Sequence, residues 1–182
     1  QPKAFPAAVG QLMTEVAGET ADGILCHGFT TESYLREVTV PALERGLAKR
    51  DRVLDDAFQL SLPAFVVTGT TEEEVARSAK GVREQIAFYG STPAYRGVLE
   101  HHGWGDLQTE LNALSKQGEW VAMGGLIDDD ILDAFAVQGP PGDIAPALLQ
   151  RFGGLVDRVS FYAPYKSAPD TWLPIIDALK AG

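Results

Sequence analysis

The sequence predicts an α/β protein in which parallel strands alternate with helices. Four segments have the apolar runs or alternation of strands: residues 3–9, 23–26, 58–67 and 157–162. Each is followed by apolar residues at helical spacing, and no Asn-Gly hairpin turn occurs anywhere. Four parallel strands make either a small open sheet or half of an eight-stranded barrel, and periodicity leaves both architectures open.

The first strand–helix–strand unit, residues 3–24, contains the strongest candidate for a ligand site. A strand ends at Val9, Gly10 and Gln11 form a turn, and a helix leads to the second strand. So short a connection is typical of a parallel βαβ unit. Ligands of parallel α/β sheets bind at the carboxyl ends of the strands. Here those ends are residues 8–11 and 26–29.

The next two helices have recognisable amino-terminal signals. Thr30 and Thr31 supply capping hydroxyls for a helix that Pro41 should kink or split near Val40. Residues 70–74 have the sequence TTEEE, an acidic capping box, and apolar residues spaced four and three apart follow as far as residue 86. This is the second strand-to-helix unit.

Residues 88–125 interrupt the alternation. The stretch is rich in aromatic residues and turns and contains short helical pieces but no strand. We interpret it as an insertion that forms a lid or wall. After it, residues 128–130 cap one helix, residues 139–143 turn into another, and the last strand and a closing helix complete the chain.

Composition narrows the class of protein. The 182 residues suit one domain, and 45% hydrophobic and 22% charged residues indicate a soluble globular chain. No apolar run approaches a membrane span, and a net charge of −10 argues against nucleic-acid binding. The single cysteine, Cys26, permits no internal disulfide, so a reducing, cytoplasmic setting is expected.

Several motifs resemble one family. They are AAVGQLM at 7–13, AGETADGIL at 17–25, FTT at 29–31, FYGSTPAY at 88–95, HGWG at 102–105 and DRVSF at 157–161. Together they resemble the luciferase-like monooxygenases, and most closely their branch dependent on coenzyme F420. The resemblance implies a (β/α)8 TIM-type barrel, of which residues 1–182 would be a single partial domain, the C-terminal half with strands five to eight. The start at Gln1 without a methionine is consistent with a processed start, an omitted tag or a fragment of a longer polypeptide, and the resemblance favours the fragment.

The resemblance also implies a function. It indicates an oxidoreductase that transfers hydride between coenzyme F420, or alternatively FMN, and a small organic substrate. Ala8, Val9, Gly10 and Gln11 would line the cofactor, although Gln11 stands where the family commonly has proline. The half-barrel would lack the amino-terminal part of the active site. The alternative is a non-catalytic half-barrel that binds a ligand or oligomerises, and unpaired sheet edges lead us to expect a homo-oligomer in either case.

Candidates for chemistry are few. His27 follows the second strand at its carboxyl end, where a general acid or substrate contact belongs; a histidine bonded to backbone is the equally weighted alternative. Cys26 has no activating partner and is expected to be inert. Asp22, at the amino end of that strand, is interpreted as a stability residue, and Arg158 is expected to form an ion pair at the same end of the sheet.

The remaining motifs have simpler explanations. His101 and His102, adjacent in sequence, should point apart, and no metal site is predicted around them. Tyr89, Tyr95 and Trp104 either wall a substrate pocket or, as we favour, fill the core. The turn at 139–142 lacks the Gly-Lys-Ser/Thr ending of a phosphate loop, and the acidic run at 128–130 is a helix cap rather than a metal site.

Overall fold

A computed structural model describes residues 2–55 and 57–181 of the chain. Its strands are β1 Ala7–Ala8, β2 Gly23–Cys26, β3 Gln59–Val67, β4 Ala136–Gln138 and β5 Arg158–Tyr162. Its α-helices are α1 Gln11–Thr20, α2 Glu32–Tyr34, α3 Val40–Ala48, α4 Glu72–Gly90, α5 Arg96–His101, α6 Gly105–Gln117, α7 Trp120–Gly125, α8 Asp129–Phe135, α9 Pro141–Phe152 and α10 Leu173–Ala181. A π-helix (Leu35–Thr39) joins α2 to α3, and two 3-10 turns cover Pro93–Tyr95 and Pro169–Thr171.

All strand pairs are parallel, and β3 is the centre of the sheet. Ser61 pairs with Leu25 of β2 on one side and with Arg158 of β5 on the other. Phe65 likewise pairs with both Ala136 of β4 and Tyr162 of β5. The strands β2 and β4 therefore share one edge of β3, one after the other, while β5 occupies the opposite edge. The predicted class, parallel strands alternating with helices, is confirmed.

Two strand predictions need correction. The predicted strand 3–9 is reduced to Ala7–Ala8, because Pro6 has no N–H to donate to the ladder, although Ala4 and Pro6 still accept backbone hydrogen bonds from Asp22 and Leu25. The strand β4 was not predicted. Three residues between two helices are too few for an alternating pattern to be visible.

The two faces of the sheet differ. Leu60, Leu62, Ala64 and Val66 of β3 are buried in a core cluster with residues of α1, α3, α9 and α10. On the other face the registered row of Ala7, Leu25, Ser61 and Arg158 contains no fully buried residue, and Leu25 is 44% exposed. Parallel sheets are normally covered on both faces, so the described residues leave one layer of the architecture uncovered.

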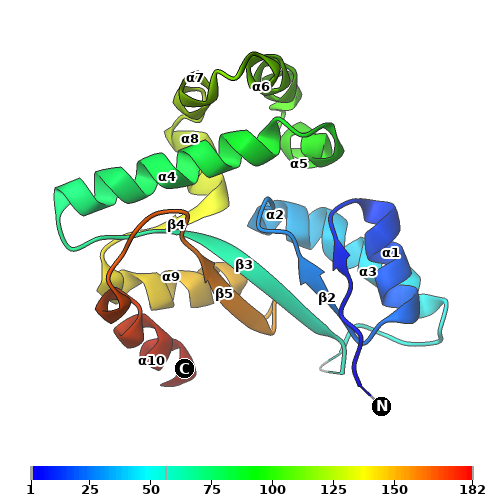
Figure 1. Ribbon diagram of the computed structural model, residues 1–182. Coiled ribbons are helices and arrows are strands. Elements are labelled where there is room, and N and C mark those ends of the chain that lie inside the picture. Colours follow the sequence, from blue (N-terminus) through cyan, green and yellow to red (C-terminus); the bar gives the residue numbers. More distant parts are fainter. Residues whose placement is uncertain (1, 56, 182) are drawn as a thin grey trace.

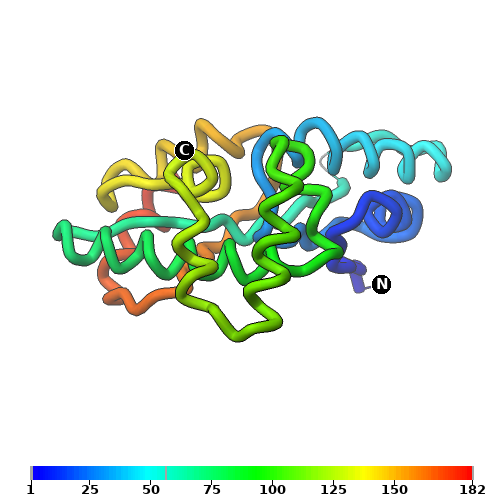
Figure 2. Tube along the Cα trace, turned by 90° about the horizontal axis from the view of Figure 1, so that it is seen from above, coloured from blue at the N-terminus to red at the C-terminus, as the bar shows by residue number. Residues whose placement is uncertain are grey.

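Helices α4 to α8 form a layer beyond the carboxyl ends of the strands (Figure 1). Viewed from above, the shorter helices of this layer lie across α4, the longest of the described helices (Figure 2). The N-cap of α4 is Thr71, whose hydroxyl accepts from the N–H of Glu74, as the capping box predicts. A second core cluster, including Phe29, Phe65 and Ile86, joins this layer to the ends of β2 and β3. No strand lies between residues 68 and 135, so the strandless region extends beyond the predicted insertion at 88–125.

The helices α1 and α3 approach each other unusually closely. A Cβ on Gly18 would lie 2.4 Å from the carbonyl oxygen of Leu43, and one on Gly46 would lie 2.0 Å from that of Glu15. Glycine is therefore required at both positions by backbone contact. Pro41 lies in the first turn of α3, directly after the π-helix, so its missing N–H falls where the helical hydrogen-bond pattern changes. The predicted split near Val40 does not occur, because residues 32–48 are helical without a break.

Candidate functional site

The β1–α1 turn leaves open space where a ligand could approach. Gly10 is the N-cap of α1, with φ −84° and ψ 153°, a conformation open to any residue. A Cβ built on Gly10 meets nothing within 4 Å. Neither backbone strain nor crowding within the described residues thus requires glycine here. The first turn of α1 has no side-chain cap and no acidic residue, so its N–H groups and the positive end of the helix dipole are available to an anion.

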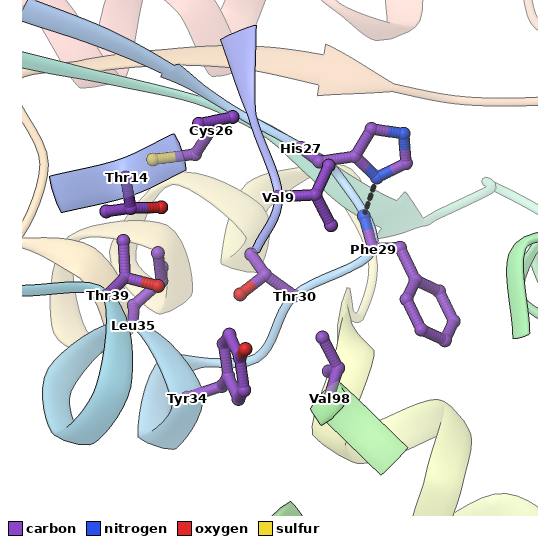
Figure 3. Close-up of a pocket in the computed structure, with 11 residues that line it drawn as sticks. Val9, Thr14, Cys26, His27, Phe29, Thr30, Tyr34, Leu35, Thr39 and Val98 are labelled. Carbon is purple, nitrogen blue, oxygen red and sulfur yellow. Dashed lines mark hydrogen bonds between the residues drawn. The ribbon is translucent and has the colours of Figure 1, made fainter. Parts of the chain in front are cut away.

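A small, partly open cavity lies beneath this turn (Figure 3). Its lining includes Ala8, Val9, Thr14, Thr30 and Thr39, and its volume of about 10 Å³ is close to that of one water molecule. The hydroxyl of Thr30 is buried without a hydrogen-bond partner among the described residues. The cavity is too small for a cofactor ring, so any such group would lie over the exposed side of the turn, where Gly10 and Gln11 are.

His27 lies at the end of β2, as its position in the sequence predicts. Its Nδ1 accepts a hydrogen bond of 3.0 Å from the N–H of Phe29, so the backbone contact expected of a structural histidine is present (Figure 3). The ring is half-buried, and burial lowers the pKa of His27 below its ordinary value of 6.5. A neutral imidazole that accepts at Nδ1 carries its proton on Nε2.

Aromatic side chains surround His27. The rings of Tyr89 and Tyr95 both lie 4.7 Å from the imidazole, the first edge-on and the second tilted. The hydroxyls of Tyr89 and Tyr162 are 2.7 Å apart, and Tyr162 stacks on Phe65 at 4.7 Å. These rings come from the end of β2, from β5 and from the helical layer. We call His27, Tyr89, Tyr95 and Tyr162 the aromatic wall.

Gly28 lets this wall close. A Cβ there would lie 3.0 Å from both the carbonyl oxygen of Pro63 and the Tyr162 ring. At Gly28, unlike at Gly10, close contacts within the chain explain why a side chain is absent. Burial, and secondarily the contact with the Tyr89 hydroxyl, raises the pKa of Tyr162, which keeps that phenol neutral.

The pair His101 and His102 belongs to a separate contact. The Nε2 atoms of His101 and His102 lie 2.7 Å and 2.8 Å from the hydroxyls of Ser33 and Thr31. Both rings thus meet the start of α2, and the prediction that they point apart is wrong, because α5 ends at this point and both side chains turn toward one neighbour. Trp104 stacks on His102 at 4.5 Å, so it is not part of the aromatic wall.

The other predicted residues have structural roles. The carboxylate of Asp22 accepts from the N–H of Ala4, and that of Asp128 caps α8 by accepting from Ile131. Burial raises the pKa of Cys26 to about 12, so its thiol is inert as predicted. The guanidinium of Arg158 lies 6.0 Å from the centroid of the Phe5 ring. Its predicted ion pair is not found among the carboxylates of residues 2–55 and 57–181.

The fold and the site together define the class. A parallel α/β sheet, covered by helices on one face and carrying its polar and aromatic candidates at the carboxyl ends, is of the TIM-barrel type. The chain belongs to the luciferase-like monooxygenase family, whose model matches residues 1–158. The family suggested by the sequence motifs is thereby confirmed.

Relatives agree with this assignment. An uncharacterized protein of Mycobacterium tuberculosis (strain H37Rv) is 59% identical over 160 residues, which are 87% of this chain and 46% of that protein. The 5,10-methylenetetrahydromethanopterin reductase of Methanopyrus kandleri is 28% identical over 162 residues, 88% of this chain and 44% of that enzyme. The chain thus spans about half the length of the curated relatives it matches.

Solved structures show the same fold. The coenzyme F420-dependent tetrahydromethanopterin reductase from Methanopyrus kandleri superposes with a TM-score of 0.68 at 22% identity, over 87% of this chain and 44% of that one. An F420-dependent secondary alcohol dehydrogenase, in complex with an F420-acetone adduct, gives 0.63 at 12% identity, over 98% and 49%. Among the helices that the structure describes, none has the length and hydropathy required to cross a bilayer.

Proposed function

We propose that this chain is part of an oxidoreductase that transfers hydride between coenzyme F420 and a small organic substrate. Family membership supports oxidoreductase chemistry. Two solved structures of the same fold are F420-dependent enzymes, which favours F420 over FMN as the cofactor. The non-catalytic alternative has no specific observation in its favour. A second part of the active site would come from the half of the barrel that these residues do not include, and a cytoplasmic homo-oligomer remains our prediction.

The observation that carries this proposal is the β1–α1 turn. Gly10 has free space in front of it, and the uncapped amides of α1 lie at its side. An anionic group would gain hydrogen bonds and a favourable dipole there at no steric cost. We assign Ala8, Val9, Gly10 and Gln11 to the cofactor, with Gly10 and Gln11 contributing backbone N–H groups. The bound group would supply the two-electron chemistry, while the chain binds, orients and shields it from water.

The test uses a substitution that favours the helix but blocks the anion. In Gly10→Asp, the new carboxylate caps α1, so the free energy of unfolding should stay unchanged or rise slightly. The same carboxylate competes with an anion for the same amides, and titration with oxidised F420 should show at least a tenfold loss of affinity. FMN should bind the unaltered chain more weakly than F420.

Gly142→Asp is the matched control. Gly142 is the second residue of α9, and a Cβ there also meets nothing within 4 Å. Figure 1 shows α9 and α1 on opposite sides of the molecule. The control should bind F420 as the unaltered chain does. Equal F420 affinity in both aspartate variants, or no F420 binding by the chain or by a longer protein containing it, would refute the assignment.

A further inference from the structure

We infer that His27 binds the oxygen of a neutral, flat carbonyl substrate by donating a hydrogen bond from Nε2. This inference rests on the proposed function, because it describes the substrate of the same site. It assigns His27 to binding and orientation of the substrate, and it makes no claim that His27 transfers a proton.

The first support is the fixed state of the ring. Nδ1 is occupied by the N–H of Phe29, so it acts as an acceptor and the proton of the neutral ring lies on Nε2. Burial disfavours the imidazolium form, in which Nδ1 would lose this contact. The ring is thus a donor of one hydrogen bond at one defined atom, a property that suits an acceptor oxygen and does not suit a cationic ligand.

The second support is what surrounds that atom. Nε2 lies on the opposite side of the ring from the Phe29 contact (Figure 3), and it has no hydrogen-bond partner within residues 2–55 and 57–181. A half-buried N–H without a partner is satisfied by water or by a ligand. Because the ring is only half-buried, a small molecule can reach this donor.

The third support is the chemistry of the neighbours. Tyr89 and Tyr95 present ring edges and faces at 4.7 Å from His27, and the Tyr89 hydroxyl is engaged with that of Tyr162. The wall that these residues form contains no lysine or arginine side chain. A carboxylate or phosphate placed against it would lose hydration with no cation and only uncharged donors in return, whereas a flat neutral molecule would stack on the rings. The best-suited acceptor is therefore a carbonyl oxygen.

Two variants separate this role from a structural one. His27→Asn keeps an acceptor at the position of Nδ1, so the contact with Phe29 can survive, but it has no atom at Nε2. His27→Gln places an N–H donor at the same number of bonds from Cβ as Nε2. A structural role predicts that Asn substitutes better, whereas substrate binding predicts that Gln does.

The probe is acetophenone, with α-methylstyrene as its oxygen-free isostere. Binding is followed in nitrogen-15 spectra of the histidine side chains, with the His27 signals assigned by their loss in the variants. The unaltered chain should show His27 as the Nε2–H tautomer at neutral pH, and acetophenone, but not α-methylstyrene, should shift that Nε2 signal. Acetophenone affinity should fall about tenfold in His27→Asn and stay within about threefold in His27→Gln, as expected for one hydrogen bond.

Several outcomes would overturn the inference. They are the opposite tautomer, equal shifts by both probes, no shift at millimolar acetophenone with or without F420, or tighter binding of benzoate than of acetophenone. F420 is titrated into the same samples. If F420 binds and His27 does not respond to acetophenone, this inference fails while the proposed function stands; if His27 responds and F420 does not bind, the proposed cofactor is wrong.

Discussion

The glycines of the helices α1 and α3 and the glycine that precedes α1 have opposite surroundings. Gly18 and Gly46 bring α1 and α3 so close that a Cβ on either would overlap backbone atoms. Gly10, at the start of the same helix α1, has no neighbour within 4 Å of where its Cβ would be. The helix is therefore pressed against its partner along its length and left open at its amino end.

This difference separates two reasons for a glycine. At Gly18 and Gly46 the fold explains the missing side chain, and no function is needed. At Gly10 the described residues give no such explanation, since its φ is ordinary and its surroundings are empty. A glycine that the fold does not require, such as Gly10, is therefore the better indication of a ligand site.

The largest effect is expected from Gly46→Ala. The added methyl would lie 2.0 Å from the carbonyl oxygen of Glu15, and a backbone atom cannot move aside as a side chain can. We expect the free energy of unfolding to fall by about 3 kcal/mol, at the upper end of overpacking effects. Urea unfolding followed by circular dichroism measures it. A loss below about 1 kcal/mol would mean that α1 and α3 are less tightly packed than described.

The same substitution at Gly10 should act on binding rather than stability. Gly10→Ala replaces an acceptable N-cap by a poor one, which costs less than about 1 kcal/mol in the free energy of unfolding. The methyl group occupies the space proposed for the ligand, so F420 affinity should fall about tenfold, or about 1.4 kcal/mol. A variant that unfolds as readily as Gly46→Ala would remove the contrast between the two sites.

Mild acid should weaken the carboxyl-end contacts before it affects the α1–α3 pair. Burial lowers the pKa of His27 below the ordinary 6.5, and burial is also the main cause of the lowered pKa of His102. At a pH between the folded and unfolded pKa values the unfolded chain binds more protons, so the free energy of unfolding falls as pH decreases below 6.5. Glu15, whose pKa is lowered by hydrogen bonds from Lys49 and Arg45, keeps its stabilising contacts until pH falls below 4.5.

Unfolding measured between pH 7.5 and 5 tests this order. The double variant His27→Asn, His102→Gln should lose most of the dependence on pH in that range. A slope that persists unchanged in the double variant would assign the effect to other groups.

The smallest effect is expected from Thr30→Val. The substitution keeps the shape of the side chain and removes a buried hydroxyl that has no partner among residues 2–55 and 57–181. We expect the free energy of unfolding to rise by about 0.5 kcal/mol, because a dehydrated hydroxyl without a hydrogen bond is costly. A decrease would show that a water molecule in the cavity satisfies Thr30, and a crystal structure would then contain that water.

Much of the fold could be predicted from the sequence. The capping residues Thr71 and Asp128 and the apolar spacing behind them gave correct helix starts, since a cap and a helical face are local properties. The strand β4 was missed because its pairing with β3 depends on a partner about 70 residues away. The position of Phe5 beside Arg158 was not predicted, because the two residues are 153 positions apart in the sequence.

The candidate site was predictable in part. The rule that ligands bind at the carboxyl ends of strands selected Gly10 and His27 as candidates, and their ligand contacts remain a prediction. The partnership of Tyr89 with Tyr162, and the position of Tyr95 over His27, arise from contacts across 73 and 68 residues of chain, which no local pattern records. The motif FYGSTPAY did contain two of the three tyrosines, so an aromatic motif at the end of a long helix was the available signal.

The central position of β3 has a consequence for how the molecule opens. Along its nine residues β3 is flanked by β2 and then β4 on one side and by β5 on the other, whereas β1 has one neighbour and only two paired residues. Under native-state hydrogen exchange the amides of β1 should therefore lose their protons first and those of β3 last. The strand at the ligand corner would then be the first to detach from the sheet, and a bound cofactor would slow its exchange more than that of any other strand.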